Sequence, residues 1–141
     1  MKPTKDSTNE RQLAWWRQPS VIYFIAAGRP PAAIKVRVTT RATVRERLEK
    51  TQTHNHEPVK LLGVIPFDTG EFPMRAAEDQ ERLLHIQFAA LNRFKPHTRG
   101  AEWLTSSPEL LSVVTATATP PETLGLPRFV CTPINPNDRN A

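Results

Sequence analysis

The sequence is poor in features that mark several classes of protein. It has a single cysteine, Cys131, which excludes an intramolecular disulfide framework and a zinc site built from several thiolates. Its longest apolar run, residues 21–27, is far too short to cross a membrane. The charged N-terminus lacks the apolar core of a signal peptide. We therefore expect a soluble, intracellular, cytoplasmic protein without a membrane partner.

Aromatic residues are also few, at 7%, and hydrophobic residues make up only 38% of the chain. This scarcity indicates that part of the chain does not pack into a core. Residues 115–141 combine Thr/Ala alternation with several prolines and show no periodic apolar face. We predict a flexible basic N-terminus over 1–19, one folded domain over 20–114, and a disordered Pro/Thr-rich tail over 115–141.

The charge balance is moderately basic. A formal charge of +5 and a pI of about 9.9 favour a polyanionic partner such as DNA, although many basic proteins never touch nucleic acid. The sequence shows no zinc finger, no helix-turn-helix spacing and no aromatic-rich platform for single strands. Selectivity for a DNA target would then come from DNA structure, from the surface of the domain or from a protein partner.

Hydrophobic periodicity predicts an α/β (α+β) fold with the element order β-β-α-β-α-α. Residues 21–27 and 33–39 have the pattern of strands, and the short Gly/Pro link between them indicates an antiparallel pair. The other predicted elements are a helix over 41–53, a strand over 59–66, a helix over 74–94, a short extended piece at 103–104 and a short helix from 107.

Two of these elements carry candidate functional groups. Strand alternation places Lys35 and Arg37 on one face of the second strand. In the helix over 74–94, Glu81 lies on the same stripe as Leu84 and Phe88. A carboxylate on a buried face needs a partner, because an unpaired charge there is costly. That partner is either a divalent ion or a neighbouring Arg or Lys.

Several segments together resemble the GIY-YIG endonuclease superfamily over about residues 21–112. They are, in order, Tyr23-Phe24-Ile25, Ile34-Lys35-Val36, Arg47-Leu48-x-x-x-Gln52-Thr53, Leu61-Leu62-Gly63, Glu81-x-x-Leu84-His85-x-x-Phe88 and Glu102-Trp103. The chain is most similar to the phage and bacterial branch whose second motif reads Lys-Ile-Gly instead of Tyr-Ile-Gly. The resemblance implies a small three-stranded antiparallel sheet flanked by helices, and a divalent-metal-dependent endonuclease that hydrolyses DNA.

The resemblance also implies roles for four residues. Tyr23 would act as, or orient, the general base for the attacking water, and Lys35 would replace the second-motif tyrosine. Arg47 would bind and polarise the scissile phosphate, and Glu81 would be the protein ligand of Mg²⁺ (or Mn²⁺). Such a set suits phosphodiester hydrolysis, because Mg²⁺ often takes only one or two protein carboxylates. We also expect Lys35 to lower the pKa of Tyr23.

The sequence departs from the family pattern at Arg37, which stands where the second motif has glycine. This arginine either fills space that the substrate needs or adds a phosphate contact. It belongs to a predicted nucleic-acid-binding set with Arg41, Arg45 and Lys50, in which Arg45 competes with Arg47 for the phosphate role. Two other hypotheses are a catalytically degenerate member that binds nucleic acid or protein, and an unrelated small α/β protein.

Five further residues have a structural interpretation beside a functional one. Trp103 is expected in the core, and His85 is expected to pack on its helix. His54 and His56 suggest a metal site, but their spacing is only local and we do not assign them as ligands. Glu102 is left open.

Overall fold

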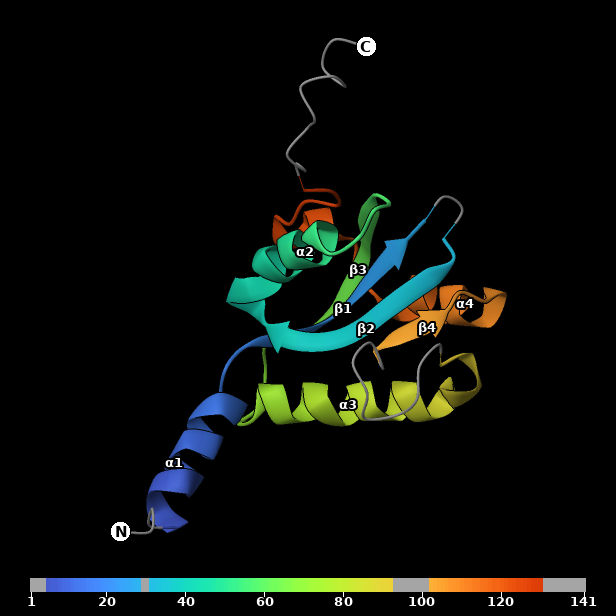
Figure 1. The fold of residues 1–141 in the computed structure, drawn as a ribbon. Coiled ribbons are helices and arrows are strands. Elements are labelled where there is room, and N and C mark those ends of the chain that lie inside the picture. The colour runs from blue at the N-terminus through green and yellow to red at the C-terminus, as the bar shows by residue number, and fades with distance from the viewer. Residues whose placement is uncertain (1–4, 29–30, 93–101, 131–141) are drawn as a thin grey trace.

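The structure is a computed structural model that describes residues 5–28, 31–92 and 102–130 (Figure 1). The helices and strands are α1 (Lys5–Trp16), β1 (Ser20–Ala27), β2 (Ala33–Thr40), α2 (Val44–Thr53), β3 (Val59–Phe67), α3 (Pro73–Gln87), β4 (Trp103–Thr105) and α4 (Pro108–Thr117), with 3-10 turns η1 (Arg41–Thr43), η2 (Ala89–Leu91) and η3 (Pro121–Leu124). The α+β class is confirmed. Cys131 lies outside the described residues.

The strands form one antiparallel sheet of four strands in the order β3-β1-β2-β4. The expected count of three is wrong, because the short piece at 103–104 pairs with the start of β2. A three-residue strand is too short for its side-chain alternation to be recognised in a sequence. Its pairing with β2 is also a contact between distant parts of the chain. β1 is central, and its neighbours β2 and β3 are both aligned along its full length.

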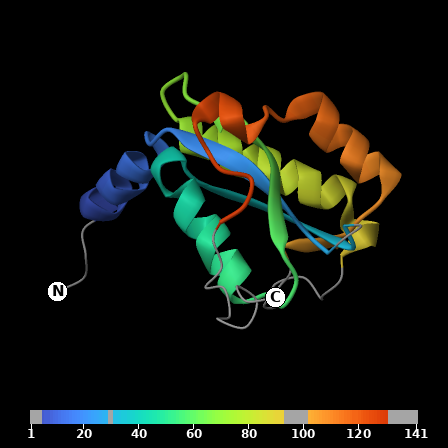
Figure 2. The same cartoon turned by 90° about the horizontal axis from the view of Figure 1, so that it is seen from above.

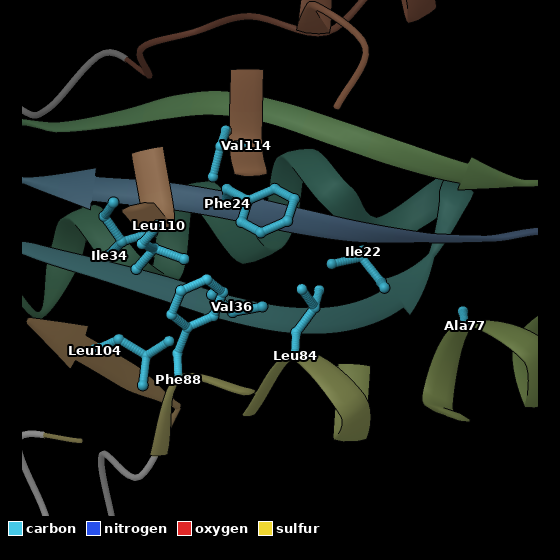
Figure 3. Packing of buried hydrophobic residues seen from close by; sticks show 10 residues of the cluster. All are labelled: Ile22, Phe24, Ile34, Val36, Ala77, Leu84, Phe88, Leu104, Leu110 and Val114. Carbon is cyan, nitrogen blue, oxygen red and sulfur yellow. The ribbon is translucent and has the colours of Figure 1, made fainter. Parts of the chain in front are cut away.

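Helices cover both faces of the sheet (Figures 1 and 2). Alternate residues of β1 point to opposite sides, so Ile22 and Phe24 face α3 and α4 while Tyr23 and Ile25 face α2. Figure 3 shows the first of these clusters, in which Leu84 of α3 and Phe88, directly after the end of that helix, meet the strand residues. The sheet is therefore buried on both faces.

α3 is shorter than the helix predicted over 74–94. It ends at Gln87, because the backbone of Phe88 leaves the helical region (φ −109°, ψ 28°) and a 3-10 turn follows. Leu91 in that turn still packs against the core. The apolar period thus continues past the end of the helix, which is why periodicity alone misplaces the boundary.

The N-terminal segment, expected to be flexible over 1–19, contains α1 and contacts the start of α3. The indole N–H groups of Trp15 and Trp16 donate to the two carboxylate oxygens of Glu78, each at 3.1 Å. Trp16 packs edge-on against Phe72, and the guanidinium of Arg75 lies 4.8 Å from the Trp16 ring. Trp15 stays exposed and Trp16 is half-buried, so hydrogen bonds and ring contacts attach this segment to α3.

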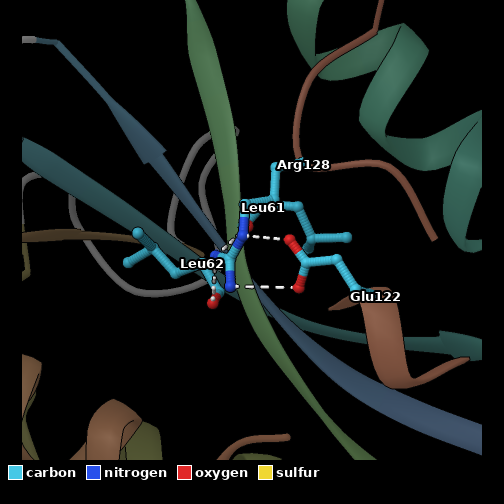
Figure 4. Close-up of polar contacts among 4 residues, drawn as sticks. All are labelled: Leu61, Leu62, Glu122 and Arg128. Carbon is cyan, nitrogen blue, oxygen red and sulfur yellow. Dashed lines mark hydrogen bonds and ion pairs between the residues drawn. The ribbon is translucent and has the colours of Figure 1, made fainter. Parts of the chain in front are cut away.

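The C-terminal strap, residues 118–130, contradicts the predicted loose tail for the part that the structure describes. Thr119 and Val64 exchange backbone hydrogen bonds of 2.7 and 3.0 Å, so the strap covers the outer edge of β3. Arg128 pairs with Glu122 and donates to the carbonyls of Leu61 and Leu62 (Figure 4). These contacts, together with Leu124, Leu126 and Val130 packed against the cluster under α2, hold a segment that has no apolar period. Residues 131–141 lie outside the described residues.

The described helices are also informative about membranes: none of them has both the length and the apolar character needed to span a bilayer.

Candidate active site

A pocket of about 600 Å³ opens on the α2 side of the sheet, towards the β2–β4 edge. β1 contributes Tyr23, and β2 contributes Lys35 and Arg37. Tyr23 is aligned with Arg37 across the ladder, and paired residues of an antiparallel ladder share a face, so the strands direct these side chains together. Residues that were predicted from the first and the second motif therefore lie in one concave site.

The helix α2 forms the opposite wall. Arg47, Lys50, Thr51 and His54 recur at helical spacing, so one face of α2 lines the pocket while Leu48 points to the core. The hydroxyl of Thr51 donates to the carbonyl of Arg47 at 2.8 Å and accepts from the Nζ of Lys35 at 3.2 Å. This bond ties the helix wall to the strand wall.

The arginines divide into paired and unpaired groups. Arg41 pairs with Asp68 at 2.9 Å and Arg45 with Glu49 at 3.4 Å, and neither lines the pocket. Arg37 and Arg47 line the pocket and form no ion pair with any described residue. Between the two rivals for the phosphate role, the pocket contains Arg47. Unpaired guanidinium groups in a concave site are suited to bind an anion.

Tyr23 is almost fully buried, with 2% of its surface exposed, and belongs to the cluster under α2. Burial raises its pKa to about 12, although the positive charges of Arg37 and Arg47 partly oppose the shift. The expectation that Lys35 lowers the pKa of this phenol is wrong in direction, because desolvation of the phenolate outweighs the nearby cations. Tyr23 therefore keeps its proton at neutral pH.

Lys35 shows the opposite shift. Burial lowers the pKa of its ammonium below the usual value, and the charges of Arg37 and Arg47 lower it further, while Glu102 opposes them. At a given pH, a lysine with a lowered pKa is more often the neutral amine, which is the only form that can accept a proton. Lys35 is thus better prepared than Tyr23 to act as a base in this pocket.

Glu81 lies beside the pocket and is not one of its lining residues. Its carboxylate accepts a hydrogen bond from the backbone N–H of Val38, and four residues later His85 Nε2 bonds the carbonyl of Val36 at 2.8 Å. These two side chains of α3 therefore supply hydrogen-bond partners for backbone groups of β2 that lie beyond the end of β4. Burial raises the pKa of Glu81, and the charge of Arg37 opposes the rise.

One oxygen of Glu81 remains without a partner. Oε2 is buried and forms no hydrogen bond with any described residue. In the described part of the chain, no group of three or more His, Cys, Asp or Glu side chains is placed to hold a metal. The residues therefore fit only an ion such as Mg²⁺ that accepts a single protein carboxylate and fills its other positions with water and phosphate oxygens.

Sequence reasoning missed part of the lining. Trp103, which we expected in the core, lies in the pocket with Glu102, Asn55 and Thr51, and it belongs to neither buried cluster. The missing signal is the register of β4, which aligns Trp103 with Lys35 and so places both on the pocket face. Asn55 lies one helical turn after Thr51, just past the end of α2, and its place in the lining could have been inferred from that spacing.

No protein-family model matches the chain, and neither a curated protein sequence nor a solved structure matches it. The resemblance to GIY-YIG endonucleases stays a prediction. A function for the pocket must therefore follow from its geometry and its charge.

Proposed function

We propose that the protein is a divalent-metal-dependent endonuclease that hydrolyses phosphodiester bonds in DNA. The observation that carries this proposal is that Arg37 and Arg47 line the same pocket and form no ion pair with a described residue. The described acidic lining is limited to Glu102, so the pocket is strongly basic. The phosphodiester backbone of DNA is an anion whose charge such a pocket can neutralise.

In this proposal Arg47 binds a non-bridging oxygen of the scissile phosphate, and Lys50, one turn further along α2, holds a neighbouring phosphate. The hydroxyl of Tyr23 is protonated and orients the attacking water. Lys35 accepts a proton from that water, and its bond to Thr51 holds the amine in place. This assignment moves the role of base from Tyr23 to Lys35.

Glu81 would hold the metal through Oε2, its unpartnered oxygen. A bound divalent ion supplies charge neutralisation at the phosphate and at the leaving oxygen. The backbone N–H of Val38 bonds the carboxylate and holds it at the edge of β2. The GIY-YIG-like identity of the fold is part of this proposal.

Arg37 then acts as an additional phosphate ligand, in place of the glycine of the family motif. Its side chain is exposed and unpaired among the described residues, which favours recruitment over obstruction. We expect Arg37→Gly to reduce cleavage by roughly tenfold or more, since a charge-assisted hydrogen bond contributes about 1.5–3 kcal/mol. An increase in cleavage would show instead that the arginine obstructs the substrate.

The direct test is nicking of supercoiled plasmid with Mn²⁺. We expect nicking by the wild type, and a loss of roughly 100- to 1,000-fold in Glu81→Gln and Arg47→Ala. Gln is preferable to Ala at position 81, because its amide oxygen still accepts from Val38 and leaves the edge of β2 capped. The matched control is Arg45→Ala, on the same helix but outside the pocket, which should lose much less. Equal activity in all four proteins would refute the proposal.

A second candidate is a catalytically inactive module that binds nucleic acid. It is favoured by the contact between Glu81 and Val38, which gives the carboxylate a structural role without a metal. This candidate predicts salt-sensitive DNA binding that is indifferent to EDTA, with no nicking under any condition. A protein partner that supplies selectivity is compatible with both candidates.

A further inference from the structure

One end of the pocket has a chemistry that phosphate binding does not use. Besides the cations, the lining includes Trp103 of β4, which is the ladder partner of Lys35, and His54 and Asn55, which directly follow the last residue of α2. An indole ring beside an imidazole and an amide is the combination that proteins use to hold a planar heterocycle by stacking and edge hydrogen bonds.

The three tryptophans of the chain differ in how their indole groups are used. Trp15 and Trp16 donate their N–H groups to Glu78 in the contact between α1 and α3. Trp103 has no hydrogen-bond acceptor in the described part of the chain, and it lies outside both core clusters. Its neighbour Leu104 is fully buried and anchors β4 in the core. The strand is thus held by Leu104, while Trp103 presents its ring to the pocket.

The polar groups at this end are held in place and partly unused. The Nδ2 of Asn55 donates to the carbonyl of Thr51 at 2.6 Å, which leaves the amide oxygen as an acceptor. The Nδ1 of His54 bonds the carbonyl of Lys50 at 2.8 Å, which leaves Nε2 available. Both side chains are therefore positioned by α2 itself and can read the edge of a ligand without first being ordered.

We propose that this end of the pocket, formed by Trp103, Asn55 and His54, is a subsite for one unpaired nucleobase of a single DNA strand. The base stacks on Trp103, and its phosphates lie on Arg37, Arg47 and Lys50. A volume of about 600 Å³ suffices for one nucleotide, whereas a base inside a duplex would first have to leave its stack. This inference rests on the proposed function for its DNA substrate and names the substrate class: unpaired or flipped-out strands.

The test measures binding in EDTA at one fixed salt concentration, so that it does not depend on cleavage. Three labelled ligands of equal length are compared by fluorescence anisotropy: a single strand, its duplex, and a strand of abasic sugars that carries the phosphates without bases. We expect the single strand to bind roughly tenfold or more tightly than the abasic strand. Trp103→Ala should abolish this difference and leave affinity for the abasic strand nearly unchanged.

The matched control is Trp15→Phe, which removes an indole outside the pocket and should leave all three affinities unchanged. If Trp103→Ala does not fold, a Trp15→Phe/Trp16→Phe protein keeps Trp103 as its sole tryptophan. Its fluorescence should be quenched by the single strand and not by the abasic strand. Equal binding of single and abasic strands by the wild type, or absence of this quenching, would overturn the inference. Base-dependent binding without nicking would retain the subsite and refute only the nuclease.

Discussion

The unpartnered oxygen of Glu81 leads to a prediction that separates stability from function. Replacement by Gln keeps an amide oxygen for the N–H of Val38 and removes a buried negative charge. Burial disfavours the ionised carboxylate, and the neutral carboxamide removes that buried charge, while the position of Oε2 stays without a partner among the described residues. We therefore expect Glu81→Gln to raise the free energy of unfolding at pH 7 by about 1 kcal/mol, which corresponds to an increase in Tm of about 3–5 °C for a chain of this size.

A second carboxylate on the same helix supplies the control. Both oxygens of Glu78 accept indole N–H groups, so Glu78→Gln must abandon one of these bonds. We expect this variant to lose about 0.5–1 kcal/mol of stability. Urea unfolding followed by circular dichroism measures both variants. The same exchange of carboxylate for carboxamide should thus change the free energy of unfolding in opposite directions at two positions three residues apart.

The dependence on pH adds an independent check. Because burial raises the pKa of Glu81 above its usual 4.5, the folded state holds the proton more tightly than the unfolded state. The ionised carboxylate therefore lowers the free energy of unfolding of the wild type at pH 7. This loss of stability disappears as the pH falls through the raised pKa towards 4.5. The difference in the free energy of unfolding between Glu81→Gln and the wild type should become smaller as the pH falls through that range. A variant less stable than the wild type at pH 7, or an advantage that does not change with pH, would refute this reasoning.

A bound metal ion should reverse the order of stability, so that the wild type becomes more stable than Glu81→Gln. If Oε2 binds Mn²⁺ only in the folded wild type, the ion at one hundred times its Kd stabilises that protein by about 2.7 kcal/mol and leaves Glu81→Gln unaffected. Thermal unfolding with and without Mn²⁺ measures this effect. An equal response of the two proteins would place the metal elsewhere.

Two other predictions concern single atoms of the fold. Tyr23 is the only tyrosine, so absorbance at 295 nm reports its titration alone. We expect a midpoint near pH 12 in the native protein and near the ordinary value of 10.0 in urea. A native midpoint near 10 would contradict its burial. Stability should correspondingly fall as the pH rises from 10 towards 12. At Gly63, an added Cβ would lie 2.8 Å from the Cβ of Ala118, so Gly63→Ala should cost about 2 kcal/mol in urea unfolding. Ala118→Gly in the same chain should recover part of that loss, and additive losses would show that the clash is not the cause.

Local patterns were sufficient to predict most of the secondary structure. Alternation in 33–39 and the capped start at Ser107 were read correctly, because each depends on a few neighbouring residues. The strap was missed because its order comes from contacts of Thr119 and Arg128 with β3, which lies more than fifty residues earlier in the chain. Composition alone could not reveal those contacts.

The candidate site likewise has features that local patterns predict and features that depend on the tertiary structure. Alternation and helical spacing placed Lys35, Arg37 and Glu81 on particular faces before any tertiary structure was known. The choice of Arg47 over Arg45, and the position of Trp103, required the orientation of α2 and the register of β4. The direction of the pKa shift of Tyr23 required its depth of burial, which a sequence does not state.

The two strand walls of the pocket differ in how firmly they are attached. β1 and β2 are aligned over eight residue pairs, whereas β4 meets β2 over only three. Short ladders open at lower free energy than long ones, so amide hydrogens of β4 should exchange with solvent earlier than those of β1. Each such opening would carry Trp103 away from the fixed cations. Under the proposed function, such an opening would let a long DNA strand enter the site from the side while β1 and β2 stay paired.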